Sequence, residues 1–352
     1  MSRRHGVAVL GGTGYVAGEF LRLLAGHPSL KLVAVSSESR AGQAVAATFP
    51  NLALAWPDTR FCDEAGLEAA VRDGRVRALF SAAPHGAAAA RIDALLHTAA
   101  AAGAPLTIVD ASADFRFRDA AAYQRVYGHP HPCPERLAEF ASALPEHLDG
   151  CPAPHVGHPG CFVTSVLLGI VPLLAAGLAE PEFFVSAVTG STGVGRKLGE
   201  TTHHPERHAN MFAYQPLVHR HRPEIEQLAA AAAAPCKVHF VPHSGAWARG
   251  IHATIHGRLA AGADGPALRA ALDAAYAGAP FVEVLDAPPR IKDVAGSNRA
   301  RLAVAADGES FVVMSVIDNL VKGAAGGALQ WMNRLLDLPE DAGLRVPGPA
   351  WT

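Results

Sequence analysis

A single cysteine, Cys161, stands between a Pro-Gly pair and a long apolar run in the stretch HVGHPGCFVTSVLLGIVPLLAAGL. This spacing predicts a helix that starts at or next to the cysteine. Free amide N–H groups and the helix dipole would there stabilise a thiolate, and the same amides could bind a carbonyl oxygen that becomes an oxyanion. A small core residue is the alternative, but the sequence favours a nucleophile. The remaining cysteines lack this setting and are predicted to be structural: Cys62, Cys133, Cys151 and Cys236.

A second group of reactive side chains occurs in HRHRPEI, which contains His219, His221 and Glu224. In an extended chain the two histidines would point to one side, with the carboxylate close behind. A histidine oriented by a carboxylate is the arrangement that general acid–base catalysis needs. The neighbouring THHPERH is not predicted to bind a metal, because Pro205 is expected to disrupt any helix that would align its histidines and no H-E-x-x-H frame is present.

The N-terminal stretch VAVLGGTGYVAGE has its glycines directly after an apolar run and before a helical one. Such a turn lets the backbone approach a pyrophosphate at a helix N-terminus, so it predicts a dinucleotide site. Ala17 replaces the strict third glycine. Further on, Glu38 could bind a ribose 2′-hydroxyl, as in NAD sites, whereas Ser37, Ser39 and Arg40 could receive a 2′-phosphate. The conflict stays open, with NADP favoured.

A third glycine-rich stretch, TGSTGVGRK, has two glycines at the separation of a phosphate loop. A nucleoside-triphosphate loop then needs Lys followed by Ser or Thr, and this chain offers Arg196, Lys197 and Leu198 instead. The two cations could still hold an anionic group of a substrate.

The elements that must position these residues fall into two patterns. Over the first third, short β-branched runs (6–12, 30–37, 78–84 and 105–114) alternate with helical stretches (17–27 and 91–103), which predicts a Rossmann-type parallel sheet. From about 161 the strands alternate polar and apolar residues, which predicts an α+β domain with a mixed, mostly antiparallel sheet. The polar, proline-rich segment 117–157 is expected to be a loop that links the two. A last helix, 324–336, is expected to pack on the first domain.

These patterns predict a two-domain α/β protein. Residues 1–157 with 320–352 would bind the dinucleotide, and residues 158–319 would form the catalytic, substrate-binding and oligomerisation domain. The chain of 352 residues has a formal net charge of −2. That balance predicts no nucleic-acid partner and no membrane surface as partner. The five cysteines are scattered and odd in number, which favours a reducing compartment. Since we also predict no signal segment and no membrane span, we expect the protein in the cytoplasm.

Taken together, the motifs resemble those of the N-acetyl-gamma-glutamyl-phosphate reductase family, which is similar in fold and chemistry to aspartate-semialdehyde dehydrogenase. The likeness runs in order along almost the whole chain, through GGTGYVAGE, PHG (84–86), DASADFR (110–116), HPGC (158–161), GSTGVGRK, HRHRPEI, RGI (249–251), GSN (296–298) and IDNLVKGAAGGALQWMN (317–333).

The resemblance implies a role for individual residues. The family's nucleophile falls on Cys161, its catalytic histidine on His219, with His221 as the less favoured holder of that role, and the orienting acid on Glu224. The implied NADP(H) cleft comprises Gly11, Thr13, Gly14, Tyr15, Ala17, Ser37, Arg40, Pro84 and Asn319. Candidates for binding the substrate's phosphate and carboxylate are Arg116, Arg196, Lys197, His221 and Arg249.

The implied reaction is NADPH-dependent reduction of N-acetyl-L-glutamyl 5-phosphate to the semialdehyde through a cysteine thioester, in arginine biosynthesis. A related branch reduces aminoadipyl phosphate on a carrier protein in lysine biosynthesis, and this stays an alternative because HHPER resembles that branch. A redox sensor that binds NADP(H) without turnover is a third, non-enzymatic alternative. Two departures from the family are Glu38, where Arg is frequent, and Phe162-Val163 after the cysteine, where Tyr-Pro is common. By analogy with the family, the chain is expected to form a homo-oligomer, a dimer or a tetramer.

Overall fold

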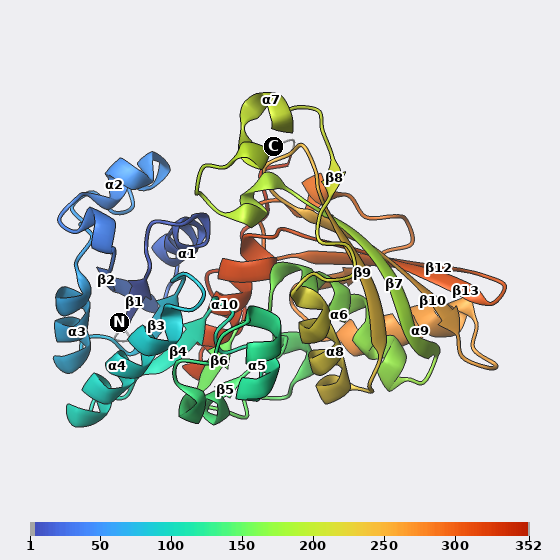
Figure 1. The fold of residues 1–352 in the computed structure, drawn as a ribbon, viewed down its shortest axis with the longest axis horizontal. Coiled ribbons are helices and arrows are strands. Elements are labelled where there is room, and N and C mark those ends of the chain that lie inside the picture. The colour runs from blue at the N-terminus through green and yellow to red at the C-terminus, as the bar shows by residue number, and fades with distance from the viewer. Residues whose placement is uncertain (1–3, 351–352) are drawn as a thin grey trace. The chain divides into compact units, whose positions relative to one another are not determined.

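The computed structural model describes residues 4–350, and its helices and strands form two compact units (Figure 1). The first unit runs to Ser142 and also includes Gly150–His158 and Ala325–Arg345. The second comprises Ala143–Asp149, Pro159–Ala324 and the segment from Val346. The domain bounds predicted from the sequence differ from these units by a few residues and stay a prediction.

The β-branched runs of the first third form the parallel sheet that their pattern predicts. Its strand order is β2-β1-β3-β4-β6-β5, and every pair in it is parallel. The central strands are buried along their whole length, as a parallel sheet covered on both faces requires. The strands are β1 (His5–Leu10), β2 (Leu30–Val35), β3 (Ala78–Ser81), β4 (Thr107–Asp110), β5 (Phe140–Ala141) and β6 (His155–Gly157).

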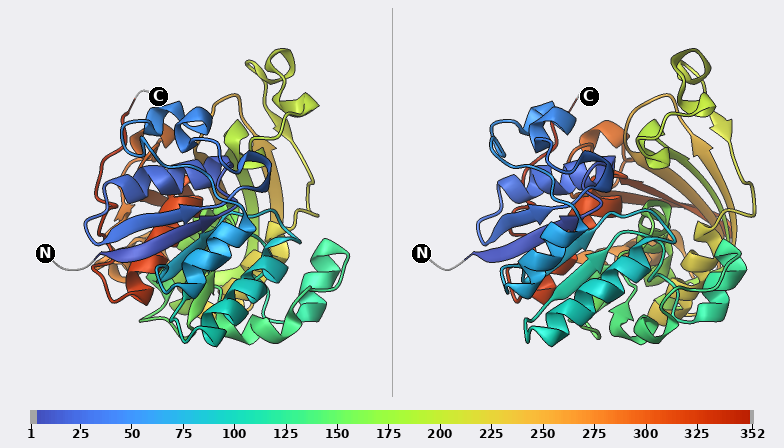
Figure 2. Two further views of the ribbon diagram at one scale, coloured as in Figure 1. Left: turned by 90° about the vertical axis from the view of Figure 1, so that its left-hand side faces the viewer. Right: turned by 60° about the vertical axis from the view of Figure 1, so that its left-hand side comes forward.

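The helices of the first unit flank this sheet, whose strands are blue to green in Figure 2. The chain's last helix belongs here as well: it contacts α1 and β4, and His27 Nε2 lies 3.0 Å from Asn333 Oδ1. The helices are α1 (Tyr15–Ala25), α2 (Val45–Thr48), α3 (Glu64–Arg72), α4 (Ala88–Ala101), α5 (Ala120–Tyr127) and α10 (Gly326–Leu335).

The expectation that 117–157 is a linking loop is wrong. This segment forms α5 and the last two strands of the sheet, and most of it belongs to the first unit. An aromatic contact explains the difference, because Phe140 of the segment stacks at 3.8 Å on Phe115, just before it, and this buried pair holds the segment at the sheet edge. Polar and proline-rich composition concealed these few anchoring rings.

The second unit is built on a mixed sheet in the order β11-β12-β13-β10-β7-β9-β8. Four of its six strand pairs are antiparallel; β11–β12 and β7–β9 are parallel. The strands are β7 (Ala179–Thr189), β8 (Phe212–Ala213), β9 (Lys237–Ser244), β10 (Ile251–Leu259), β11 (Val282–Val284), β12 (Ala300–Asp307) and β13 (Ser310–Ile317).

One face of this mixed sheet is covered by α6 (Cys161–Ala175), the apolar helix predicted from the sequence. It contacts β10 and β13 as well as α8 (His221–Ala232) and α9 (Gly265–Tyr276). On β7, alternate residues such as Phe183 and Val185 are buried beneath it. A one-turn helix, α7 (His204–Arg207), and a π-helical turn at Val321–Ala325 complete the unit. None of the helices within residues 4–350 combines the length and apolar character that a membrane span requires.

Candidate active site

Cys161 is the first residue of α6, as its sequence setting predicts. Gly160 is the N-cap, with extended backbone angles, and its carbonyl accepts the Thr164 N–H at 2.9 Å. No side chain of the described residues caps this helix start. The first-turn N–H groups of a helix lack intrahelical partners, so they present positive charge at the cysteine. Cys161 is half-buried, and Phe162 behind it is buried.

The backbone that precedes the cysteine is fixed by Glu224. Its Oε1 accepts the Gly160 N–H at 2.8 Å, and the side chain is fully buried. A buried carboxylate needs hydrogen-bond donors to offset the loss of water, and this one finds a donor one residue before Cys161. Glu224 therefore connects α8 to the start of α6.

The expectation that HRHRPEI is extended is wrong, because α8 begins at His221. Pro223 permits this, since it lies in the first turn, where a missing N–H costs no intrahelical bond. The two histidines still meet: the His221 N–H donates to His219 Nδ1 at 3.2 Å, and their ring centroids lie 4.7 Å apart. With Nδ1 as acceptor, a neutral His219 holds its proton at Nε2.

Burial, together with the smaller effect of the neighbouring Arg220 charge, lowers the pKa of His219 to about 4. The imidazole is therefore neutral at pH 7. The Tyr214 ring packs edge-on to it at 5.5 Å, and burial raises the pKa of the tyrosine hydroxyl, with the charge of Cys161 adding to the effect. Phe162 lies 5.9 Å from the ring of His219, so the imidazole is held in a largely apolar setting.

Two glycines let other groups approach the cysteine closely. A Cβ added to Gly160 would lie 2.4 Å from His221 Nε2. A Cβ added to Gly323, in the π-helical turn, would lie 2.7 Å from the Cβ of Cys161. Both distances are far below ordinary contact, so glycine is needed at both positions. His221 thus lies against the residue before Cys161, as part of the site's wall.

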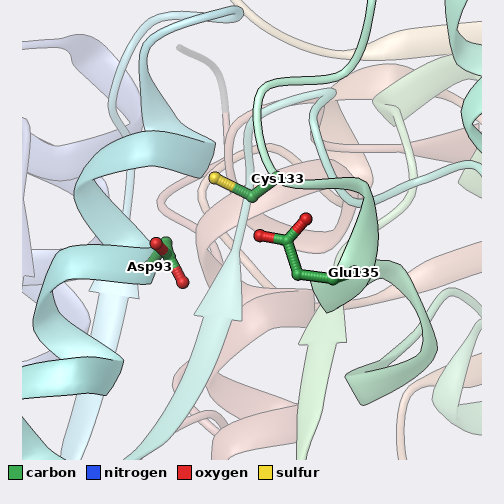
Figure 3. Close-up of side chains that lie close together, drawn as sticks. All are labelled: Asp93, Cys133 and Glu135. Atoms are coloured by element: carbon green, nitrogen blue, oxygen red, sulfur yellow. The ribbon is translucent and has the colours of Figure 1, made fainter.

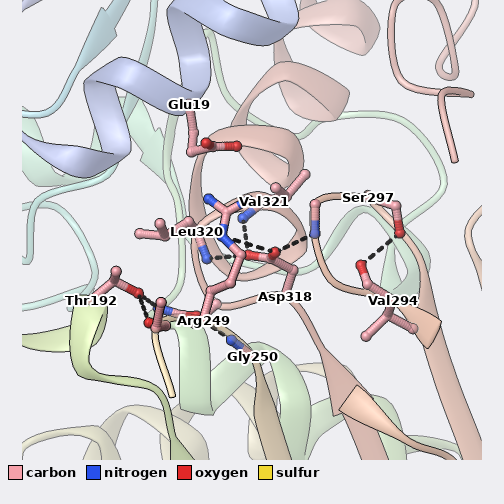
Figure 4. Close-up of polar contacts among 12 residues, drawn as sticks. Glu19, Thr192, Arg249, Gly250, Val294, Ser297, Asp318, Leu320 and Val321 are labelled. Carbon is pink, nitrogen blue, oxygen red and sulfur yellow. Dashed lines mark hydrogen bonds and ion pairs between the residues drawn. The ribbon is translucent and has the colours of Figure 1, made fainter. Parts of the chain in front are cut away.

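Arg249 lies beside Asp318 in a group of polar contacts that Figure 4 shows. Its Nε lies 3.6 Å from Asp318 Oδ2, and about a quarter of its side chain is exposed. Asn319 accepts the Gly250 N–H at 2.7 Å and donates to Thr192 Oγ1 at 3.0 Å. Both ends of this amide thus hold the second unit's own loops, and its cofactor contact stays a prediction.

The other predicted substrate-binding cations lie in different settings. Arg196 and Lys197 are exposed, after a short 3-10 turn. Arg116 belongs to the first unit, is buried, and donates to the Ala111 carbonyl at 2.8 Å. Their roles toward a substrate stay predictions.

The glycine turn after β1 fits a dinucleotide phosphate. Gly11 has a φ of +76°, and a Cβ there would meet the Ala83 backbone at 2.8 Å. Gly14 is the N-cap of α1, and a Cβ there would have no neighbour within 4 Å. The space on the Cβ side of Gly14 is therefore open, which is compatible with a phosphate close to this helix start. Tyr15 begins the helix and is partly exposed, while Ala17 is fully buried and permits close packing.

The remaining residues of the predicted cofactor cleft follow strands of the same sheet. Thr13 lies in the glycine turn, half-buried, and Ser37 is buried just after β2. Arg40 donates to Gln43 Oε1 at 3.3 Å. Pro84 is exposed after β3, and Ala87 donates to its carbonyl. These positions are compatible with a cofactor at the carboxyl ends of the strands.

Two acidic residues that organise these loops were missed in the sequence. Asp114 accepts the N–H groups of Gly86 at 2.8 Å and Ala89 at 3.0 Å, and so anchors the loop that contains Pro84. Asp318 has the same role in the second unit, where it accepts the N–H groups of Leu320 and Val321. The available signal was an acidic residue soon after a strand: Asp114 lies four residues after the end of β4, in DASADFR, and Asp318 directly follows β13, in IDNL.

A cluster of Asp93, Cys133 and Glu135 in the first unit has the spacing of metal ligands (Figure 3). The chemistry does not fit, because Arg136 Nε already pairs with Asp93 at 2.7 Å. Burial and the nearby acidic groups also raise the pKa of the Cys133 thiol, which opposes the thiolate that a metal needs. Burial likewise raises the pKa of the other cysteines predicted to be structural, which are Cys62, Cys151 and Cys236.

The prediction that Pro205 prevents a helix in the histidine-rich loop is wrong. Pro205 lies in the first turn of α7, where proline is tolerated, and the rings of His204 and His208 stack at 5.3 Å. Both rings are exposed, and no carboxylate or cysteine within residues 4–350 joins them in a metal-ligand group.

Both units match families of known proteins. Residues 6–140 match a family described as semialdehyde dehydrogenase, NAD binding domain, and residues 161–319 match semialdehyde dehydrogenase, dimerisation domain. Among solved structures, aspartate semialdehyde dehydrogenase II from Vibrio cholerae superposes with a TM-score of 0.71 at 14% identity, covering 95% of this chain and 99% of that one. Aspartate semialdehyde dehydrogenase with NADP from Candida albicans superposes at 0.67 with 15% identity, covering 97% and 99%.

Full-length relatives are much closer in sequence. The N-acetyl-gamma-glutamyl-phosphate reductase of Acidithiobacillus ferrooxidans is 41% identical over 349 residues, which cover 96% of each chain. That of Rhodospirillum rubrum is 41% identical over 353 residues, covering 98% of each, and that of Laribacter hongkongensis is 40% identical over 350 residues, covering 97% and 98%.

Proposed function

The chain belongs to the N-acetyl-gamma-glutamyl-phosphate reductase family, and we propose that it reduces N-acetyl-L-glutamyl 5-phosphate to N-acetyl-L-glutamate 5-semialdehyde with NADPH, a step of arginine biosynthesis. The observation that carries this proposal is Cys161 at the start of α6, with Glu224 fixing the residue before it. Acyl transfer to a thiol needs this combination of an activated nucleophile and preorganised N–H donors.

The first step forms a thioester. The Cys161 thiolate attacks the acyl carbon, a C–S bond forms, and the C–O bond to phosphate breaks so that phosphate leaves with the electron pair. The N–H groups of the first turn of α6 hold the carbonyl oxygen while it is negatively charged. The positive helix end favours both the thiolate and this oxyanion.

In the second half-reaction, NADPH, bound at the glycine turn, would supply the hydride. Because His219 holds a proton at Nε2, we assign it as the hydrogen-bond donor to the carbonyl oxygen while that oxygen carries negative charge in this half-reaction. The C=O bond then re-forms from the oxyanion, the C–S bond breaks with its electron pair returning to Cys161, and the semialdehyde leaves while His219 keeps its proton. His221 and Glu224 keep this arrangement in place, and Arg249 is the best-placed candidate for an anionic group of the substrate, because a buried carboxylate fixes its guanidinium.

NADP(H) is the cofactor we propose. The turn at Gly11 and Gly14 fits a pyrophosphate, while Ser37 and Arg40 offer a hydroxyl and a cation to a 2′-phosphate. Glu38 is exposed in the same loop, where it would oppose that phosphate unless it turns to solvent. The ratio of the kcat/KM values for NADP and NAD measures how strongly the site prefers NADP.

We also propose that the chain forms a homo-oligomer through its second unit. On β7, the side that faces away from α6 carries Phe184, which is 54% exposed and stacks on His239 at 4.6 Å. The match of residues 161–319 to a dimerisation domain supports this proposal, and the exposed Phe184 ring is a candidate contact on that sheet face. Light scattering should give a mass above that of one chain, and Phe184→Asp should lower it.

The reverse reaction tests the proposed activity. The protein is mixed with N-acetylglutamate semialdehyde, phosphate and NADP, and the absorbance of the reduced cofactor is followed. Phosphate-dependent reduction that is lost in Cys161→Ala supports the proposal. No phosphate-dependent signal with NADP or NAD, under conditions where the protein binds NADP, would refute the acetylglutamyl substrate.

A further inference from the structure

We propose that Asp318 is a positioning residue that fixes both Arg249 for an anionic group of the substrate and the turn that supports Cys161. The part of this inference that concerns the substrate rests on the proposed function. All residues involved belong to the second unit.

The carboxylate of Asp318 is fully buried, and its two oxygens bind different parts of the chain. Oδ1 accepts the N–H groups of Leu320 at 2.8 Å and Val321 at 3.0 Å. Oδ2 accepts the Gly296 N–H at 2.6 Å and faces Arg249 Nε at 3.6 Å (Figure 4). The Asp318 carboxylate thus binds the turn at Leu320 and Val321 with one oxygen and faces the Arg249 guanidinium with the other.

The Oδ1 side leads to the nucleophile. Its two acceptor bonds close the bend between β13 and the π-helical turn Val321–Ala325, and the main-chain carbonyl of Asp318 accepts the Gly323 N–H at 3.0 Å. Gly323 in turn lies against Cys161, so closely that a Cβ on it would be 3.1 Å from the cysteine Cα. The bend therefore forms the support on which the first residue of α6 rests.

The Oδ2 side leads to Arg249. The N–H of Gly296, at a φ of +78°, fixes the carboxylate orientation, so the arginine meets a charge that cannot rotate away. The arginine backbone is fixed too: Gly190 donates to the Gly250 carbonyl at 2.9 Å, and Thr192 donates to the Ala248 carbonyl at 3.0 Å. With backbone and Nε both held, the guanidinium keeps one direction, which is what recognition of a phosphate or carboxylate needs.

A buried, charge-bearing acceptor of this kind cannot be replaced by an amide without loss. In Asp318→Asn, one oxygen becomes an NH₂ group, which must face either the Leu320 and Val321 N–H groups or the Gly296 N–H and Arg249. Donors would then meet donors, and the charge opposite the guanidinium would be lost. Since the amide can keep the two bonds at Oδ1 only by giving up the Oδ2 side, we expect the Arg249 side to be weakened.

The test uses the reverse reaction with the full-length protein and the variants Asp318→Asn, Arg249→Gln and the double variant. Arg249→Gln identifies the anion: it should raise the KM of either phosphate or the semialdehyde. Asp318→Asn should raise that same KM by about 10-fold or more, because the ion pair that orients the guanidinium loses its negative partner. The double variant should be no worse than Arg249→Gln alone. Asp273→Asn, which removes an exposed ion pair with Arg269 on α9, is the matched control and should leave both KM values unchanged.

A second experiment measures the reactivity of the Cys161 thiol directly and needs no turnover. Alkylation of Cys161 by iodoacetamide, located by peptide mass spectrometry, should change in rate in Asp318→Ala, which removes the acceptor of the Leu320 and Val321 N–H groups, and should stay as in the wild type in Asp318→Asn and Arg249→Gln. Unchanged KM values in a folded Asp318→Asn, or an unchanged alkylation rate in a folded Asp318→Ala, would overturn the inference. So would a variant that loses only kcat, with effects additive to Arg249→Gln, because that describes a merely structural residue. If the wild type shows no phosphate-dependent reaction, the proposed function fails, while the alkylation readout still tests the support of Cys161.

Discussion

Gly160→Ala is the substitution for which the site geometry gives the sharpest expectation. The added Cβ would lie 2.4 Å from Nε2, 2.8 Å from Cε1 and 2.9 Å from Cδ2 of His221, so it would collide with one edge of a buried ring. Ordinary contact starts near 3.4 Å. Either the imidazole or the start of α6 must therefore shift by about 1 Å. Overpacking of this kind typically costs about 1–3 kcal/mol. A displacement of about 1 Å at a reacting group can cost about 100-fold in rate.

Thermal unfolding and reverse-reaction kinetics measure the two effects separately. We expect the melting temperature of Gly160→Ala to fall by several degrees, at about 2–4 °C per kcal/mol for domains of this size. We expect kcat to fall at least about 10-fold. Gly278→Ala is the matched control in the same unit, because a Cβ at that position has no neighbour within 4 Å. A Gly160→Ala variant as stable and as active as Gly278→Ala would refute the packing of His221 against the residue before Cys161.

Three further predictions concern the same site and the cofactor turn. Glu224→Ala removes the acceptor of the Gly160 N–H, so the free energy of unfolding should fall by about 1–3 kcal/mol and kcat should fall as well. Glu224→Gln keeps an acceptor and should lose less of both. Equal losses in the two variants would contradict this role of Glu224. Because its pKa is lowered to about 4, His219 takes up a proton at a lower pH in the folded protein than in the unfolded chain, so the free energy of unfolding should fall by about 1.4 kcal/mol for each pH unit from about pH 6.5 down to about pH 4, and no further below that. Its NMR signal, assigned with His219→Asn, should stay that of a neutral ring from pH 8 to pH 5.5, and a midpoint near 6.5 would count against the burial argument. Gly11→Ala, at a φ of +76° and 2.8 Å from the Ala83 backbone, should weaken NADP binding in calorimetry without slowing alkylation of the active-site thiol, and unchanged affinity would exclude this turn as the phosphate site.

Helices and strands that are determined by runs of neighbouring residues could be predicted from the sequence. The apolar run after Cys161 could become only a buried helix, and the β-branched runs near Val7 and Val109 could become only covered strands. The segment 117–157 could not be predicted in the same way. Its fold depends on Phe115 and Phe140 meeting across a distance in sequence, and neither residue lies in an alternating pattern.

The candidate site shows the same division. Cys161 could be found because helix start, glycine turn and apolar run are adjacent in sequence. The prediction that His219 and His221 lie on one side of an extended chain was right about their proximity and wrong about the conformation, because Pro223 can occupy the first turn of a helix as well as an extended chain. Asp318 could not be found from spacing, since the groups it binds at Gly296 and Arg249 come from separate loops.

The most direct test of the central claim omits phosphate from the reverse reaction. With N-acetylglutamate semialdehyde and NADP alone, the protein should reduce one equivalent of cofactor per active site in a burst and then stop. Mass spectrometry of the quenched protein should locate the acyl group on the peptide that contains Cys161, and added phosphate should release it. A burst without an adduct on that peptide, or an adduct at another residue, would contradict the thioester mechanism.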